Sequence, residues 1–160
     1  MTTTSRVPAT IDYLVAAFTA ASTLGAATPP VAVYDGPVLT DAPDQLILWV
    51  GMDDPNSGEA PIAAESDTEW AALGALAQNE EFTIHCVAEA WGGADQVRAI
   101  RLTAYGIVAA VETLLRADVS LGGTLPSGWA RVTGSQLRQD NVQQGAIARV
   151  AFNINCRARI

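Results

Sequence analysis

From Gly145 to Ile160 the chain alternates between apolar and polar side chains almost without interruption. Successive side chains of a β-strand point to opposite faces, so this pattern predicts a strand with one buried and one polar face. The expected inward residues are Ala146, Ala148, Val150, Phe152, Ile154, Cys156, Ala158 and Ile160, and the expected outward residues are Arg149, Asn153, Asn155, Arg157 and Arg159. So long a strand needs partners, which limits the chain to folds built around a sheet.

Further segments can supply those partners. Apolar or alternating runs predict strands at 31–34, 45–50, 81–91 and 129–139. The strand at 81–91 is expected to form a hairpin with a segment near 67–76, which could instead form a helical turn. Its inward side chains are expected to be Phe82, Ile84, Cys86, Ala88 and Ala90, and its outward ones include Glu81, Thr83, His85 and Glu89. Residues 51–66, rich in Pro, Gly, Asn, Ser and acidic residues, are expected to form a loop.

Two segments have the apolar spacing of helices. The first runs over 8–24, with Pro8 suited to its first turn and Gly25 placed to end it. The second begins at Asp95, whose charge suits the positive end of a helix. Its apolar stripe comprises Val97, Ile100, Ala104, Ile107, Val108, Val111, Leu114 and Leu115. The order α, β, β, β, β, α, β, β predicts one α+β domain over 1–160, a mostly antiparallel sheet with two helices packed on one face.

The composition excludes several classes of protein. Of the 160 residues 49% are apolar and 16% are charged, which is not the balance of a disordered chain. No apolar stretch reaches the roughly 18 residues that cross a bilayer, and the first residues do not resemble a signal peptide. We therefore expect no membrane association, and a protein that stays in the cytoplasm of its host until it is assembled. The two cysteines, Cys86 and Cys156, are expected to be buried thiols and not a disulfide or a metal site.

The residues needed for catalysis are scarce. His85 is the only histidine, so no two-histidine metal site or histidine relay fits within one chain. The chain has no lysine, which excludes a phosphate-binding Gly-x-x-x-x-Gly-Lys loop. Cys86 follows His85 directly, so the two side chains would point to opposite faces of a strand and could not act as a pair. We expect no enzymatic activity, no cofactor and no metal, unless a site forms between subunits.

Charge is distributed unevenly along the sequence. Residues 1–97 hold fourteen acidic residues and one arginine, a balance of −13, and residues 98–160 hold eight arginines and three acidic residues, a balance of +5. If these regions formed opposite faces, subunits could join head to tail and close into a ring. If they intermix in the fold, the charges cancel. The candidate subunit-interface residues are Arg149, Arg157, Arg159, Glu80 and Glu81.

The net charge of −8 disfavours a nucleic-acid groove, which needs clustered basic residues. An acidic protein could still line a passage through which DNA slips without sticking. The densest acidic cluster of the 51–66 loop, Asp53, Asp54 and Glu59, does not have the spacing of a calcium-binding EF-hand. We expect these three residues to line a pore, to form a contact between rings, or simply to lie in solvent.

Five segments carry a resemblance to a known family: Val31–Pro37, Leu48–Asp54, Glu69–Gly74, Glu80–Ile84 and Gly145–Ile160. Together they make almost the whole chain similar to the actinophage tail terminator proteins. The resemblance implies a small α/β subunit of a virion, without catalytic residues, that forms a hexameric ring on the tail tube. Such a ring stops tube growth, offers the surface on which the connector or head-completion protein docks, and lets DNA pass through its lumen.

Two other functions remain open. The chain could form a different ring of the neck or tail, as a head-completion protein or a tail-tube subunit. A tube subunit would normally have a long hairpin arm and barrel strands, which the two long helices make less expected. Alternatively, the chain could be a small α+β dimer that binds a small molecule between the second helix and the sheet.

Overall fold

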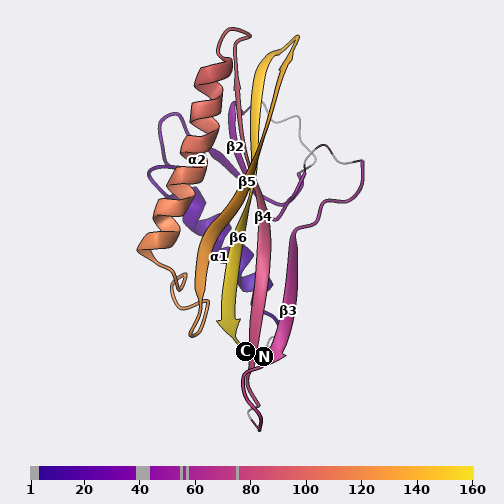
Figure 1. Cartoon of the computed structure of the whole chain (residues 1–160). Helices are drawn as coiled ribbons and strands as arrows, with labels where there is room; N and C mark the ends of the chain where they lie inside the picture. Colours follow the sequence, from indigo (N-terminus) through magenta and orange to yellow (C-terminus); the bar gives the residue numbers. More distant parts are fainter. Residues whose placement is uncertain (1–3, 39–43, 55, 57, 75) are drawn as a thin grey trace.

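The computed structural model describes residues 4–38, 44–54, 56, 58–74 and 76–160. The strands are β1 (Ala32–Asp35), β2 (Leu46–Val50), β3 (Ala64–Trp70), β4 (Gln78–Gly92), β5 (Trp129–Val142) and β6 (Gly145–Arg159), and the helices are α1 (Val7–Ala20) and α2 (Val97–Ala117). Figure 1 shows the strands as one twisted sheet with both helices beside it. The predicted α+β fold and order of elements are confirmed for the described residues.

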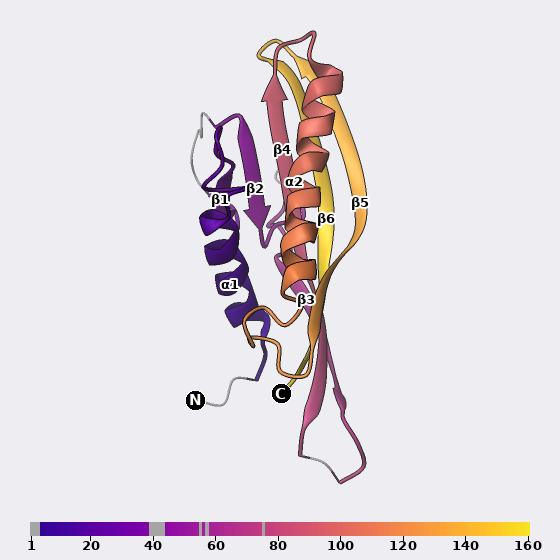
Figure 2. The same ribbon diagram turned by 90° about the vertical axis from the view of Figure 1, so that its left-hand side faces the viewer.

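The sheet is built around two long antiparallel strands, β4 and β6. Its order is β1-β2-β4-β6-β5, and only β1 and β2 run parallel. One edge of β4 is shared, since β2 pairs with residues 86–90 and β3 pairs with residues 78–84. Figure 2 shows that β3 and the start of β4 extend as a hairpin beyond the rest of the molecule.

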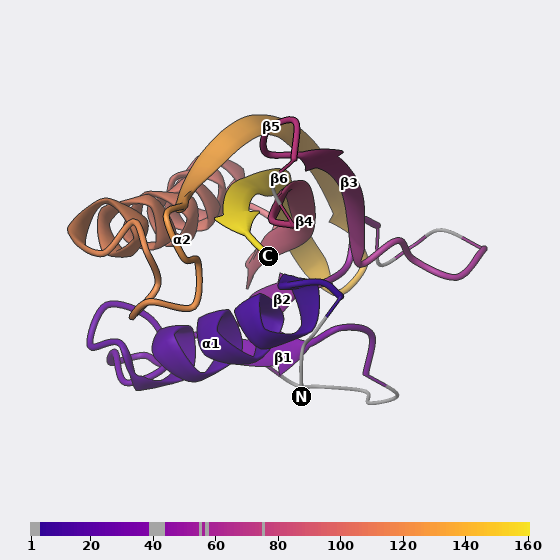
Figure 3. The same ribbon diagram turned by 90° about the horizontal axis from the view of Figure 1, so that it is seen from below.

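Both helices cover the same face of the sheet, α1 over β1 and β2, and α2 over β4, β6 and β5. Figure 3, which looks along the molecule from below, shows the helices on one side and the other side open. The core between these layers takes Leu14 and Phe18 from α1 and the predicted stripe from α2. All the expected inward residues of β4 and β6 are buried except Ile160, which is half-buried. Their alternation was therefore predicted correctly.

Several boundaries differ from the prediction. The first helix ends at Ala20 and not at Leu24, because Ala21 is extended; Gly25 lies in the following turn, where its N–H donates to Phe18. Glycine is required there, since a Cβ would lie 2.2 Å from the carbonyl oxygen of Thr19. The second helix begins at Val97, so Asp95 lies outside it, and the side chain of Gln96 accepts a hydrogen bond from the Gly93 N–H.

Strand β3 is the largest departure. It begins at Ala64, inside the predicted loop, and ends at Trp70, six residues before the predicted end at 76. All its residues after Ala64 are exposed, and polar side chains lie on both faces, so the sequence has no alternation that marks a strand. Pairing with β4 holds it in place instead, from Ala64 opposite Ile84 to Trp70 opposite Gln78. The hairpin is confirmed, and within the predicted segment 67–76 the helical turn is excluded for residues 67–70.

Candidate functional site

The face of the sheet that the helices leave open carries a row of neutral polar side chains. Thr83 and His85 come from β4, Asn153 and Asn155 from β6, and Thr133 from β5. We call these five residues the polar face. They lie on the outward positions that the alternation predicts, because side chains two residues apart on a strand share a face. Each of them is half-buried.

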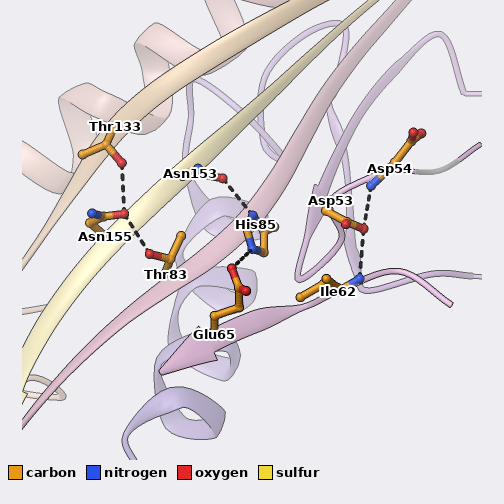
Figure 4. Close-up of polar contacts among 9 residues, drawn as sticks. All are labelled: Asp53, Asp54, Ile62, Glu65, Thr83, His85, Thr133, Asn153 and Asn155. Atoms are coloured by element: carbon orange, nitrogen blue, oxygen red, sulfur yellow. Dashed lines mark hydrogen bonds and ion pairs between the residues drawn. The ribbon is translucent and has the colours of Figure 1, made fainter. Parts of the chain in front are cut away.

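Hydrogen bonds across the strands hold the polar face together (Figure 4). The Asn155 side-chain oxygen accepts from Thr83 Oγ1 and from Thr133 Oγ1, both at 3.0 Å. His85 Nδ1 lies 2.9 Å from the side-chain oxygen of Asn153. Cross-strand pairs of this kind stabilise a sheet and fix side-chain orientation. The polar face is therefore a preorganised surface of hydroxyl, amide and imidazole groups.

His85 has partners on both ring nitrogens, since Nε2 lies 3.2 Å from the Glu65 carboxylate. Cys86, the next residue, is buried on the helix side of the sheet, and burial raises the pKa of its thiol to about 12. The pKa of Cys156 is raised in the same way, also to about 12. Both thiols are free and buried, as predicted. A thiol that stays protonated and points away from the histidine cannot act with that histidine as a nucleophile–base pair.

Two arginines of the open face pair with acidic residues of the same subunit, whereas Arg131, opposite Asn155, is exposed and stacks on the Trp129 ring. Arg138 on β5 lies 2.9 Å from Asp54, and Arg149 on β6 contacts the buried carboxylate of Glu89. Each pair joins a residue before 98 to a residue after it, so the charges that are separated in the sequence meet in the fold. For these residues the charges intermix, which is the second of the two alternatives that the sequence leaves open.

The acidic loop that follows β2 is structured at its start. Asp53 accepts hydrogen bonds from the backbone N–H groups of Asp54 and Ile62, at 2.8 and 2.9 Å. Asp54 lies beside Arg138, so the loop reaches from the end of β2 across to β5. The pKa of Asp54 is lowered, mainly by the backbone N–H of Asn56 and then by Arg138. Glu59 is exposed further along the loop. Asp53 and Asp54 thus organise the loop and do not hang freely into solvent.

The five candidate interface residues lie in different environments. Glu80 is fully buried, and its carboxylate accepts from Ser5 and Arg6 before α1, so it is not on the surface. Arg149 is half-buried against Glu89. Arg157 lies 3.5 Å from Glu81, within one subunit, and Arg159 is exposed. Of the five candidate interface residues, Glu81, Arg157 and Arg159 therefore remain as charged groups that another subunit could reach.

Two shallow depressions border the polar face. One, of about 300 Å³, lies beside His85 and Asn153 and reaches Asp53. The other, of about 330 Å³, lies between Thr83 and Asn155 and has acidic residues along its rim, Glu65, Asp67 and Glu81. Among the described residues no group of three His, Cys, Asp or Glu side chains is placed to hold a metal ion. None of the helices in this part of the chain has the length and apolar content to cross a membrane.

The tip of the β3–β4 hairpin is a surface feature that the sequence did not predict. Trp70, Leu73 and Leu76 are exposed there by 64%, 107% and 97%. Their apolar character was visible in the sequence, but only the fold shows that they extend past the core.

Comparison with known proteins yields no family: no protein-family model matches the chain, and no curated protein is similar to it in sequence.

Proposed function

We propose that this chain is a structural ring subunit at the head-proximal end of a phage tail tube. The ring, a hexamer, ends tube growth, presents the surface that the connector or head-completion protein joins, and lets DNA pass through its lumen. The assignment to a phage tail rests on the resemblance of the sequence to the actinophage tail terminator proteins. The protein would then belong to the virion, and to the host cytoplasm during assembly.

The polar face is the observation that supports a DNA passage. A duplex carries about one negative charge per 1.7 Å of its axis, and unpaired arginines would bind it by releasing counterions. On the open face Arg138 and Arg149 are neutralised by Asp54 and Glu89, and Arg131 is held against the Trp129 ring. The remaining hydroxyl and amide groups are already hydrogen-bonded to one another. A lumen lined by this face would be wet, with hydrogen-bonded polar groups at its centre and the carboxylates of Glu65, Asp67 and Glu81 at its rim, which suits a polyanion that must move without binding.

The acidic loop has a smaller part in this proposal than the sequence indicates. Because Asp53 and Asp54 hold the loop against the sheet, they border the passage and do not project into it. A contact between rings would have to use the exposed end of the loop, which includes Glu59. Head joining through that end remains part of the proposal.

A tail-tube subunit is the second candidate, because the β3–β4 hairpin extends beyond the body as an arm (Figure 2). The two functions differ in what the purified chain builds. A tube subunit forms tubes of indefinite length, whereas a terminator forms single rings or caps existing tubes. A small-molecule binder would instead form a stable dimer.

Light scattering and negative-stain imaging of the purified chain, alone and with tail tubes, separate these candidates. We expect rings of about six chains, or monomers that assemble at one end of a tube. Long tubes would favour the tube subunit, and a stable dimer that ignores tubes would contradict any ring.

DNA binding tests the polar face. The double variant Asn153→Arg and Asn155→Arg places two cations on it per subunit, and a control variant, Val119→Arg, places one on an exposed residue (49%) away from it. We expect no duplex binding by the wild type, and salt-dependent binding by rings of the double variant. Equal binding by the control and the double variant would contradict a lumen lined by this face.

A further inference from the structure

The tip of the β3–β4 hairpin is an apolar surface that no described part of the chain covers. Trp70, Leu73 and Leu76 are each more than half exposed, and with Ala72 and Gly74 they line a hollow of about 500 Å³. We call these five residues the hairpin tip. Contiguous exposed apolar side chains at the end of a projecting arm mark an interaction site.

A second uncovered apolar surface lies on α2, on the side away from the sheet. Leu102 is 62% exposed and Tyr105 is 39% exposed. Arg98, Leu102, Tyr105 and Ala109 follow one another at helical spacing, and all of them are exposed. A Cβ added at the neighbouring Gly106 would meet no atom within 4 Å. We call these five residues the outer face of α2.

The two surfaces carry complementary charge. On the hairpin, Asp67 and Glu69 are exposed just before the tip, and the nearest cation to Glu69 is Arg157 at 4.0 Å. On α2, Arg98 has no ion pair among the described residues, and Arg101 bonds only to the side-chain amide of Gln139 there. An acidic arm with an apolar end thus matches an apolar helix face flanked by unpaired arginines.

We propose that the hairpin tip of one subunit docks on the outer face of α2 of a second copy of this chain. The inference rests on the proposed ring function and identifies its subunit contact. The tip lies at one end of the molecule and α2 lies along its side, so one subunit cannot satisfy both surfaces (Figure 2). A contact between two different surfaces repeats from copy to copy, and it closes into a ring when the rotation permits.

Two variants each remove one side of this contact. Leu73→Ser with Leu76→Ser changes the tip, and Leu102→Asp changes the helix face. All three side chains are exposed, so thermal melting should stay as in the wild type. Each variant should weaken self-association by about a hundredfold or more, because burial of the leucines is lost. Val119→Ser is the control, since Val119 is also exposed, at 49%, but lies on neither surface.

Mixing the two variants gives the decisive measurement, by sedimentation velocity. The helix variant keeps an intact tip and the tip variant keeps an intact helix face, so together they can form one contact and no more. We expect a heterodimer from the mixture, monomers from each variant alone, and wild-type assembly from the control.

Three results would overturn the docking proposal. One is wild-type assembly by either variant, which leaves the ring function standing with a different contact. Another is a mixture that stays monomeric, as expected if the tip binds the tube or a membrane. The third is a wild-type chain that remains monomeric up to roughly 1 mM, in which case any ring forms only on a tube.

Discussion

Glu80 offers a sharp test of how this fold is held together. Its carboxylate is fully buried and accepts from Ser5 Oγ at 2.5 Å and from the Arg6 N–H at 2.7 Å. Ser5 Oγ in turn accepts from the Val7 N–H, at 3.1 Å. The acid on β4 therefore holds the N-cap residue of α1, Arg6, and through Ser5 it reaches the first N–H of the helix, which has no partner within the helix. It ties the residues just before α1 to the beginning of β4.

We expect Glu80→Ala to destabilise the fold by about 2–4 kcal/mol. A hydrogen bond to a charged group contributes about 1.5–3 kcal/mol, and a negative charge at a helix N-terminus adds about 0.3–1 kcal/mol. Relief of the buried charge offsets part of this loss. For a chain of this size, each kcal/mol lowers the melting temperature by about 2–4 °C, so the expected decrease is about 5–15 °C. Thermal unfolding followed by circular dichroism measures it.

The neighbouring Glu81 supplies the control. Its side chain is 60% exposed and lies 3.5 Å from Arg157, a surface pair that contributes about 1 kcal/mol or less. Glu81→Ala should therefore melt within a few degrees of the wild type. Equal melting temperatures for the two alanine variants would refute the capping role of Glu80. So would a Glu80→Ala variant that melts with the wild type.

Three further predictions concern stability and accessibility. Deleting residues 157–160 removes two backbone hydrogen bonds of 2.9 Å between Ile160 and Gln78, and we expect insoluble protein; a soluble, cooperatively melting truncation would contradict this. Cys86 and Cys156 should not react with a thiol reagent at pH 8 until the protein unfolds, since their pKa values are about 12; rapid labelling of the native protein would contradict their burial. Asp54→Asn should lower the free energy of unfolding by about 0.5 kcal/mol at neutral pH. Because the folded pKa of Asp54 lies below 3.8, this difference in stability between wild type and variant should vanish only as the pH falls through that lowered value. A difference that persists at pH 2 would exclude the ionised carboxylate as its cause.

The sequence predicts those strands and helices whose apolar side chains face the core and recur with the period of a strand or of a helix. β6 and α2 have one face against the core, so their inward residues could be identified from periodicity alone. β3 could not, because its exposed residues take their conformation from pairing with β4 and not from burial. The end of α1 was also missed, since Leu24 is buried in the turn after the helix and extends the apolar pattern past Ala20.

The candidate site shows the same limit. Alternation places Thr83, His85, Asn153 and Asn155 on the outward face, and the structure confirms that placement. It could not reveal their hydrogen bonds, which depend on the register between β4 and β6. Nor could it show that Asp54 meets Arg138, since such a contact joins residues far apart in the chain. Sequence segregation of charge therefore overstated the separation of charge in space.

An averaged electron-microscopy map of the assembled particle tests the ring most directly. We expect about six subunits around a central opening, with β4, β6 and β5 facing the opening through the polar face and α1 and α2 on the outside. A particle whose helices line the opening would contradict the assignment of the lumen. A particle with no central opening, formed alone and in the presence of tail tubes, would contradict the ring itself.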